Sequence, residues 1–255
     1  MPDIKIYGYA TSPFVRKVGA FLYYKGLPFT HVPVNPVDPA ATIGHTNGTM
    51  VPVLEIDGEY RRESSELAFW LDELFPEKPL CPAEHTEKIK TADKWVSDTF
   101  LRSIFRPAID APLDLNFRFR FWRLAALVSA HTPLPENIRH LWPDFVKAAP
   151  FIQAMGQEMD LTQSIANMQM RIGMELADLI GDGPFMSGMS APSMLDLAVF
   201  PNLIFGYMFG LEERLSAAQH PVVKEWMLRM AEHLPDNPTL VADEMKINDF
   251  RTGLG

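Results

Sequence analysis

A serine stands near the N-terminus where a strand-like segment meets a helix-like segment, in the run Tyr9-Ala-Thr-Ser12-Pro13. Serine is a favoured N-cap, and proline at the first helical position loses no hydrogen bond that it would have made. The free N–H groups of a helix N-terminus attract negative charge. We therefore expect the Ser12 hydroxyl to lie where an anion can be stabilised, although helix capping alone also accounts for this serine.

Two further pairs of residues open predicted elements. Val51-Pro52 begins an apolar run, and because proline cannot donate to a β-ladder, we expect Pro52 at the start of a strand or at a sheet edge. Glu63-Ser64 begins an amphipathic segment, where Ser64 could be a helix cap. Taken alone, an ordinary strand start and an ordinary cap explain both pairs.

The spacing of apolar residues predicts the elements that hold these pairs. Asp57-Gly58 is typical of a hairpin turn, and the opening strand–helix–strand order predicts a parallel crossover, so the sheet should be mixed. The segment 35–49 shows little periodicity and is predicted to be a loop. Strands are expected at 4–9, 29–34, 51–56 and 59–62, and helices at 14–24 and 64–75.

A change of organisation follows Phe75. The run 76–82 carries three prolines in seven residues, and only helical patterns follow it. We predict a first domain at 1–76, a linker at 77–83 and an all-helical domain at 84–255. Its helices are expected at 84–109, 116–130, 141–152 with breaks, 161–180, 193–209 and 221–234.

Composition excludes several classes of function. The net charge of -9 and scattered basic residues argue against nucleic acid as a partner. The longest apolar run falls short of the roughly 18 residues that a membrane helix needs, so no membrane association is expected. The single cysteine, Cys81, fits a reducing compartment, and we expect a cytoplasmic protein. No metal-ligand spacing and no nucleotide-binding glycine loop is found, so neither cofactor is predicted.

Four short patterns, in order along the chain, resemble the soluble glutathione transferase family. Ser12-Pro13-Phe14 is similar to the active-site turn of the family's serine and cysteine classes. Val51-Pro52 is similar to its Val-Pro step, whose proline is cis, and Glu63-Ser64 to its glutamate-serine pair. Ser193 and Asp196 are similar to the family's capping box at a buried helix. The resemblance implies an α/β thioredoxin-like domain with a mixed four-stranded sheet, followed by an all-α domain.

The resemblance also implies a function for particular residues. Ser12 is expected to stabilise the thiolate of glutathione, with Thr11 and Tyr9 as alternatives. The backbone of Val51 would pair with the cysteinyl part of glutathione, while Ser64 and Glu63 would hold the γ-glutamyl end. A small hydrophobic electrophile would be the second substrate, and a homodimer is expected. The predicted glutathione-binding residues are Phe14, His45, Met50, Val51, Pro52, Arg62, Glu63 and Ser64, and the predicted electrophile pocket contains Phe100, Ile104, Phe105 and Arg106.

One departure from the family pattern leaves an alternative open. The residue before Val51-Pro52 is commonly basic or polar in the family, whereas here it is Met50, so His45 or Arg62 would have to meet the glycyl carboxylate. A non-catalytic ligand-binding or scaffold protein on the same fold is therefore a second hypothesis. Reduction or isomerisation that uses the same thiolate is a third.

Overall fold

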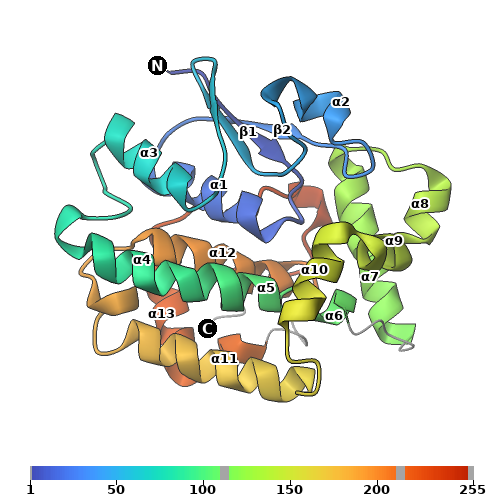
Figure 1. The fold of residues 1–255 in the computed structure, drawn as a ribbon. Helices are drawn as coiled ribbons and strands as arrows, with labels where there is room; N and C mark the ends of the chain where they lie inside the picture. The colour runs from blue at the N-terminus through green and yellow to red at the C-terminus, as the bar shows by residue number, and fades with distance from the viewer. Residues whose placement is uncertain (1, 110–114, 211–215, 252–255) are drawn as a thin grey trace.

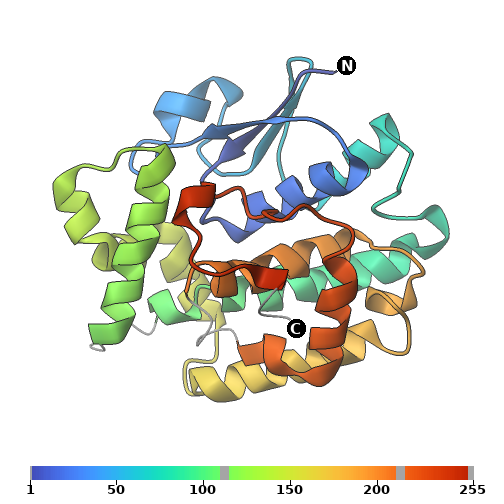
Figure 2. The same ribbon diagram turned by 180° about the vertical axis from the view of Figure 1, so that it is seen from behind.

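The computed structural model describes residues 2–109, 115–210 and 216–251. Figure 1 shows a sheet at one end of the molecule, with α1 (Pro13–Lys25) and α3 (Glu66–Leu74) between the sheet and a larger group of helices. The same layers appear from behind in Figure 2, where the C-terminal segment runs across the helices below α1. Residues 2–74 therefore build the sheet layer, and the rest of the described chain is mostly helical.

The N-terminal elements follow the predicted order, with one addition. The segment predicted to be a loop contains a short helix, α2, because residues 40–43 complete one helical turn after Pro39. The remaining elements begin or end within a few residues of their predicted bounds. They are β1 (Ile4–Gly8), α1 (Pro13–Lys25), β2 (Thr30–Pro33), α2 (Ala40–Ile43), β3 (Val53–Ile56), β4 (Glu59–Arg61) and α3 (Glu66–Leu74).

The sheet is mixed, as predicted. Its strand order is β2-β1-β3-β4, with β1 parallel to β2 and antiparallel to β3. Asp57 and Gly58 both have positive φ, of 50° and 87°, which is the backbone of the tight hairpin turn that their sequence predicts. The register pairs Tyr7 with Val53. The residues that follow β1 and those that precede β3 therefore lie at the same end of the sheet.

The two faces of β1 belong to different layers. Ile4 and Ile6 point into the main core together with α1, whereas Tyr7 packs on the other face with Val34 and Ile43. This alternation is the period of two that strand geometry imposes.

The helical part is more broken than predicted. The single helix expected over 84–109 is interrupted by a π-helical turn, Val96–Phe100, and by a break before α6, and the helix expected from 161 begins at Ile165. The helices are α4 (Thr86–Trp95), α5 (Leu101–Ser103), α6 (Arg106–Ile109), α7 (Leu115–His131), α8 (Glu136–His140), α9 (Trp142–Ala148), α10 (Pro150–Glu158), α11 (Ile165–Ile180), α12 (Met194–Met208) and α13 (Pro221–Met230).

Helix α12 is the centre of the helical part and lies beneath α1 in Figure 1. Every residue of α12 except Tyr207 is buried. It begins with the predicted capping box: the Ser193 side chain accepts from the backbone N–H of Asp196, and the Asp196 side chain accepts from the backbone N–H of Ser193. None of the helices in the described residues has the length and apolar character required to span a membrane.

Candidate functional site

Ser12 lies in a tight turn between β1 and α1. Its backbone N–H donates to the carbonyl of Tyr9 at 2.9 Å, and its backbone is extended, with φ -79° and ψ 123°. The hydroxyl accepts from the Val15 N–H at 3.5 Å, a long hydrogen bond, and the residue is 6% exposed. The hydroxyl is thus a weak helix cap whose own proton can be donated to another acceptor.

The two alternatives to Ser12 differ in their surroundings. Thr11 is half-buried at the tip of the turn. Tyr9 is half-buried against the cluster formed by Tyr7, Val34, Ile43 and Val53, and burial raises the pKa of its phenol. Tyr9 is therefore held in its neutral form, as a hydrogen-bond donor.

Val51 and Pro52 lie beside this turn. The bond between them is cis, and the next residue, Val53, pairs with Tyr7 of β1. The Val51 side chain packs on the same cluster as Tyr9. The Val51 backbone makes no hydrogen bond to another described residue, which leaves its N–H and C=O free to pair with an added strand.

Glu63 and Ser64 precede α3, which begins at Glu66 rather than at the predicted Ser64. Glu63 has a positive φ of 63°, and its carbonyl accepts from the Leu67 N–H at 3.0 Å, so the first turn of α3 closes on Glu63. Ser64 is half-buried inside this turn. The exposed Glu63 side chain and the free N–H groups of the turn therefore lie together.

A buried lysine, which sequence reasoning missed, ties α3 to α1 and α4. Lys17 donates to Ser65 Oγ at 2.9 Å and to Asp93 Oδ1 at 2.8 Å, and its side chain is fully buried. Burial lowers the pKa of Lys17, and the Asp93 carboxylate acts against this change. No local signal marks Lys17 as buried, because its partners lie 48 and 76 residues away.

The residues proposed for the glycyl carboxylate have other neighbours. The Arg62 guanidinium donates to the carbonyl and hydroxyl of Thr46, and it lies so close to Gly48 that a Cβ there would be 2.9 Å from it. His45 is exposed and packs edge-on against Tyr60 at 5.3 Å between ring centroids. Met50 is 65% exposed. Arg62 therefore contacts the loop before Val51 at Thr46 and Gly48.

Two of the four residues predicted for the electrophile pocket are buried in contacts with other parts of the chain. Phe100 is 2% exposed and stacks on Trp95 in the core. Arg106, also 2% exposed, donates to the carbonyls of Asp160, Leu161 and Gln163. The break before α6 turns Arg106 toward the loop that precedes α11, a reorientation that helical spacing alone does not reveal.

Ile104 and Phe105 are half-buried and remain candidates for the pocket. The Phe105 ring meets Phe151 of α10 edge-on at 5.7 Å, and Phe151 is itself 37% exposed. The helices α7–α10 lie at the same side of the molecule as α2 in Figure 1. An apolar surface on α10 is thus available next to the break between α5 and α6. Phe14, the remaining predicted residue, is half-buried against the main core.

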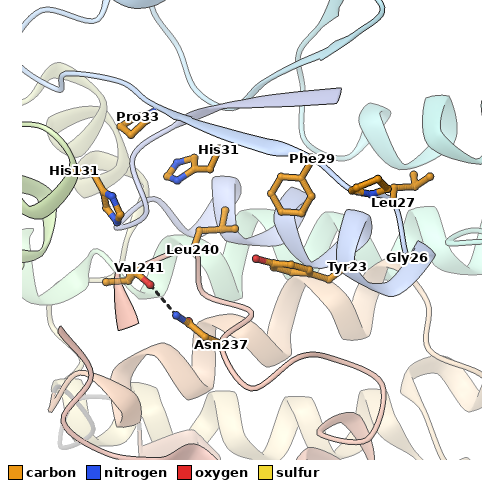
Figure 3. A pocket seen from close by; sticks show the side chains of 11 residues that line it. Tyr23, Gly26, Leu27, Phe29, His31, Pro33, His131, Asn237, Leu240 and Val241 are labelled. Atoms are coloured by element: carbon orange, nitrogen blue, oxygen red, sulfur yellow. Dashed lines mark hydrogen bonds between the residues drawn. The ribbon is translucent and has the colours of Figure 1, made fainter. Parts of the chain in front are cut away.

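A further cleft lies away from these residues. It has a volume of about 880 Å³ and is bounded by the C-terminal half of α1, β2, the end of α7 and the segment 237–241 (Figure 3). None of the predicted site residues lines it. His31 Nε2 is 2.9 Å from the Gly8 carbonyl, and the His31 ring faces His131 at 5.9 Å. Burial lowers the pKa of His31.

Metal ligands do not cluster in the described part of the chain: no three His, Cys, Asp or Glu side chains there are grouped so as to hold an ion. Cys81 is buried, and burial raises the pKa of its thiol.

Comparison with known proteins agrees with this geometry. Residues 6–79 match a family model described as the N-terminal domain of glutathione S-transferase. Glutathione S-transferase U4 of Arabidopsis thaliana is 28% identical over 88 residues, which cover 34% of this chain and 39% of that protein. The match thus spans less than half of the curated relative.

Solved structures extend the likeness to nearly the whole chain. A glutathione S-transferase from Rhodospirillum rubrum F11 has a TM-score of 0.62 at 17% identity, covering 98% of this chain and 99% of that one. The β-etherase LigF from Sphingobium sp. strain SYK-6 has a TM-score of 0.59 at 20% identity, covering 89% and 94%. At such identities these structures show the fold alone. Residues 6–79 thus match the N-terminal domain of glutathione S-transferases, and the chain as a whole shares the fold of solved glutathione transferases.

Proposed function

We propose that this protein is a glutathione transferase that activates the thiol of bound glutathione for attack on a small hydrophobic electrophile. The observation that carries the proposal is the adjacency of the Ser12 turn to Val51, whose backbone pairs with no other described residue. A glutathione transferase homologue from Sulfitobacter, solved with bound glutathione, has the same fold with a TM-score of 0.52 at 14% identity over 91% of this chain and 93% of that one.

Activation requires the site to favour a thiolate. A free cysteine thiol has a pKa near ~8.5 and is mostly protonated at neutral pH. The Ser12 hydroxyl can donate to the sulfur, and the N-terminus of α1 directs its partial positive charge to the same place. Each unit by which the thiol pKa falls corresponds to about 1.4 kcal/mol of preference for the anion.

The rest of glutathione would be held by backbone and polar groups. The Val51 N–H and C=O pair with the cysteinyl residue as an added strand. Ser64 and the N–H groups of the α3 turn bind the γ-glutamyl carboxylate, and Glu63 binds its ammonium group. His45 or Arg62 would donate to the glycyl carboxylate; of the Arg62 nitrogens, Nη2 is engaged by Thr46.

The electrophile would lie between the Ser12 turn and the apolar side chains of Ile104 and Phe105. The division into domains at 77–83 and a homodimer, in which the small domain of one subunit meets the helical domain of the other, complete the proposal. Sedimentation would measure the oligomeric state, and a monomer would contradict this last part.

Two measurements test the proposed function. Calorimetric titration should detect binding of glutathione at millimolar concentration, and the protein should conjugate glutathione to an aryl halide. In Ser12→Ala, kcat/KM should fall by about 10²-fold, because one donor to a developing anion is lost. No binding of glutathione by the wild type would refute the proposal.

A matched control separates catalysis from helix capping. Ser164 caps α11, where its hydroxyl accepts from the Asn167 N–H at 3.2 Å. Ser164→Ala should therefore cost about 1 kcal/mol of stability while conjugation is unchanged. Unchanged conjugation in Ser12→Ala would move the sulfur contact to Thr11 or Tyr9, which Thr11→Val and Tyr9→Phe then distinguish.

The second candidate function is non-catalytic ligand binding on the same fold. Met50, exposed where the family commonly has a basic or polar residue, favours it. Binding of glutathione without conjugation of any aryl halide would support this candidate over the transferase.

A further inference from the structure

A buried arginine lies directly behind the Ser12 turn. Arg16 is on the second turn of α1, and its side chain is 0% exposed. Its Nη1 donates to the Ala10 carbonyl at 2.7 Å and its Nε to Asn202 Oδ1 at 2.9 Å. The guanidinium also stacks on the Phe205 ring, 3.8 Å from its centroid. The contacts join the turn to α12 of the helical part.

Asn202 binds the other side of the same turn. Its Nδ2 donates to the Pro13 carbonyl at 3.2 Å and to the Ala198 carbonyl at 2.8 Å. The carbonyl groups on either side of Thr11-Ser12, those of Ala10 and Pro13, are thus both held by the Arg16–Asn202 pair. The position of the Ser12 hydroxyl therefore depends on a residue of α12, 190 positions along the chain.

The charge of Arg16 is not neutralised by a carboxylate in the described residues. All of its hydrogen-bond acceptors are neutral, and Nη2 is buried without a partner. Lys17, the next residue, faces Asp93 instead. Burial lowers the pKa of Arg16 to about 9, so the guanidinium is still mostly charged at neutral pH. An uncompensated buried charge is costly, and an anion that binds nearby would offset this cost.

We propose that Arg16 and Asn202 are positioning residues of the thiolate site: together they hold the Ala10–Pro13 turn, and the uncompensated charge of Arg16 favours the anionic form of the bound thiol. The inference rests on the proposed function, since it requires that glutathione binds at Ser12. It assigns a role in activation to the contact between α1 and α12.

The test measures the pKa of the thiol of bound glutathione from the ultraviolet absorbance of the thiolate as a function of pH. In Arg16→Met, the thiol pKa should rise by about one unit, a tenfold loss of thiolate at a given pH below it. The acid limb of the kcat/KM profile should shift by the same amount. Arg16→Lys keeps the positive charge but loses the guanidinium that donates to both Ala10 and Asn202, so the thiol pKa should rise by less than in Arg16→Met.

Lys25 provides a matched control. It is a cation on the same helix with a side chain only 1% exposed, but it is paired with Asp72 at 2.7 Å and lies at the end far from Ser12. Lys25→Met should lower stability without moving the thiol pKa. An equal shift in Lys25→Met and Arg16→Met would contradict the assignment, because it would make the effect a general consequence of destabilising α1.

Asn202→Asp tests the charge without removing Arg16, and it serves if Arg16→Met fails to fold. The new carboxylate would neutralise the guanidinium, so the thiol pKa should again rise. If the wild type binds glutathione with a depressed thiol pKa that both Arg16→Met and Asn202→Asp leave unchanged, this inference is wrong while the proposed function stands. If the wild type does not bind glutathione, the proposed function fails, and this inference with it.

Discussion

Asp196 is the residue on which we expect the stability of the helical part to depend most. Its carboxylate is fully buried and accepts four hydrogen bonds. Oδ1 accepts from the Met186 N–H at 2.9 Å and from Trp226 Nε1 at 2.8 Å. Oδ2 accepts from the N–H and the hydroxyl of Ser193, both at 2.9 Å. One side chain thus joins the loop before α12, the start of α12 and α13.

These contacts set the expected loss in the free energy of unfolding when Asp196 is replaced. Asp196→Ala leaves three buried N–H donors without an acceptor, and each such donor costs about 1–3 kcal/mol. We therefore expect a loss of about 4 kcal/mol in the free energy of unfolding, a large part of the roughly 5–15 kcal/mol typical of native proteins. Asp196→Asn keeps one acceptor oxygen and should lose about half as much.

The assay is urea unfolding followed by far-ultraviolet circular dichroism, with linear extrapolation to water. Circular dichroism is preferred to tryptophan fluorescence because Trp226 itself contacts Asp196. Ser193→Ala, which removes the capping hydroxyl but leaves the carboxylate, is the control and should lose about 1 kcal/mol. If Asp196→Ala unfolds within about 1 kcal/mol of the wild type, the four contacts do not act as described.

Two further outcomes are expected. Tyr7 donates to Glu55 Oε2 at 2.5 Å, so Tyr7→Phe should cost about 1–3 kcal/mol in urea unfolding yet leave aryl-halide conjugation unchanged; a large loss of conjugation would mean that this hydroxyl acts on the sulfur. Burial lowers the pKa of His31, so as the pH is lowered through about 6.5 the unfolded chain takes up a proton there before the folded chain does. The free energy of unfolding therefore decreases as the pH is lowered. His31→Gln should make this fall less steep, whereas substitution of the exposed His140 should not; equal slopes would contradict the argument.

Much of the N-terminal fold could be predicted because its signals are local. Ile4–Gly8 alternates with the period of a strand, Asp57-Gly58 has the composition of a tight turn, and Ser12-Pro13 marks a helix start. The mixed sheet follows from these signals through the rules of connection. Both interruptions of the helix expected over 84–109 were missed, because apolar residues continue through the π-helical turn at Val96–Phe100 and through the break at Ile104 and Phe105.

In the candidate site, too, the features set by neighbouring residues were predictable and those set by distant residues were not. By itself, the sequence determined that a hydroxyl stands at a helix N-terminus and that a strand follows Val51-Pro52, because both depend on neighbouring residues. Only the tertiary structure decided which cations are buried: Arg16 meets Asn202 across 186 positions, and Arg106 meets the carbonyls of a loop 54 or more positions away. Whether a charge is exposed or buried depends on what packs against it, and these partners come from distant parts of the chain.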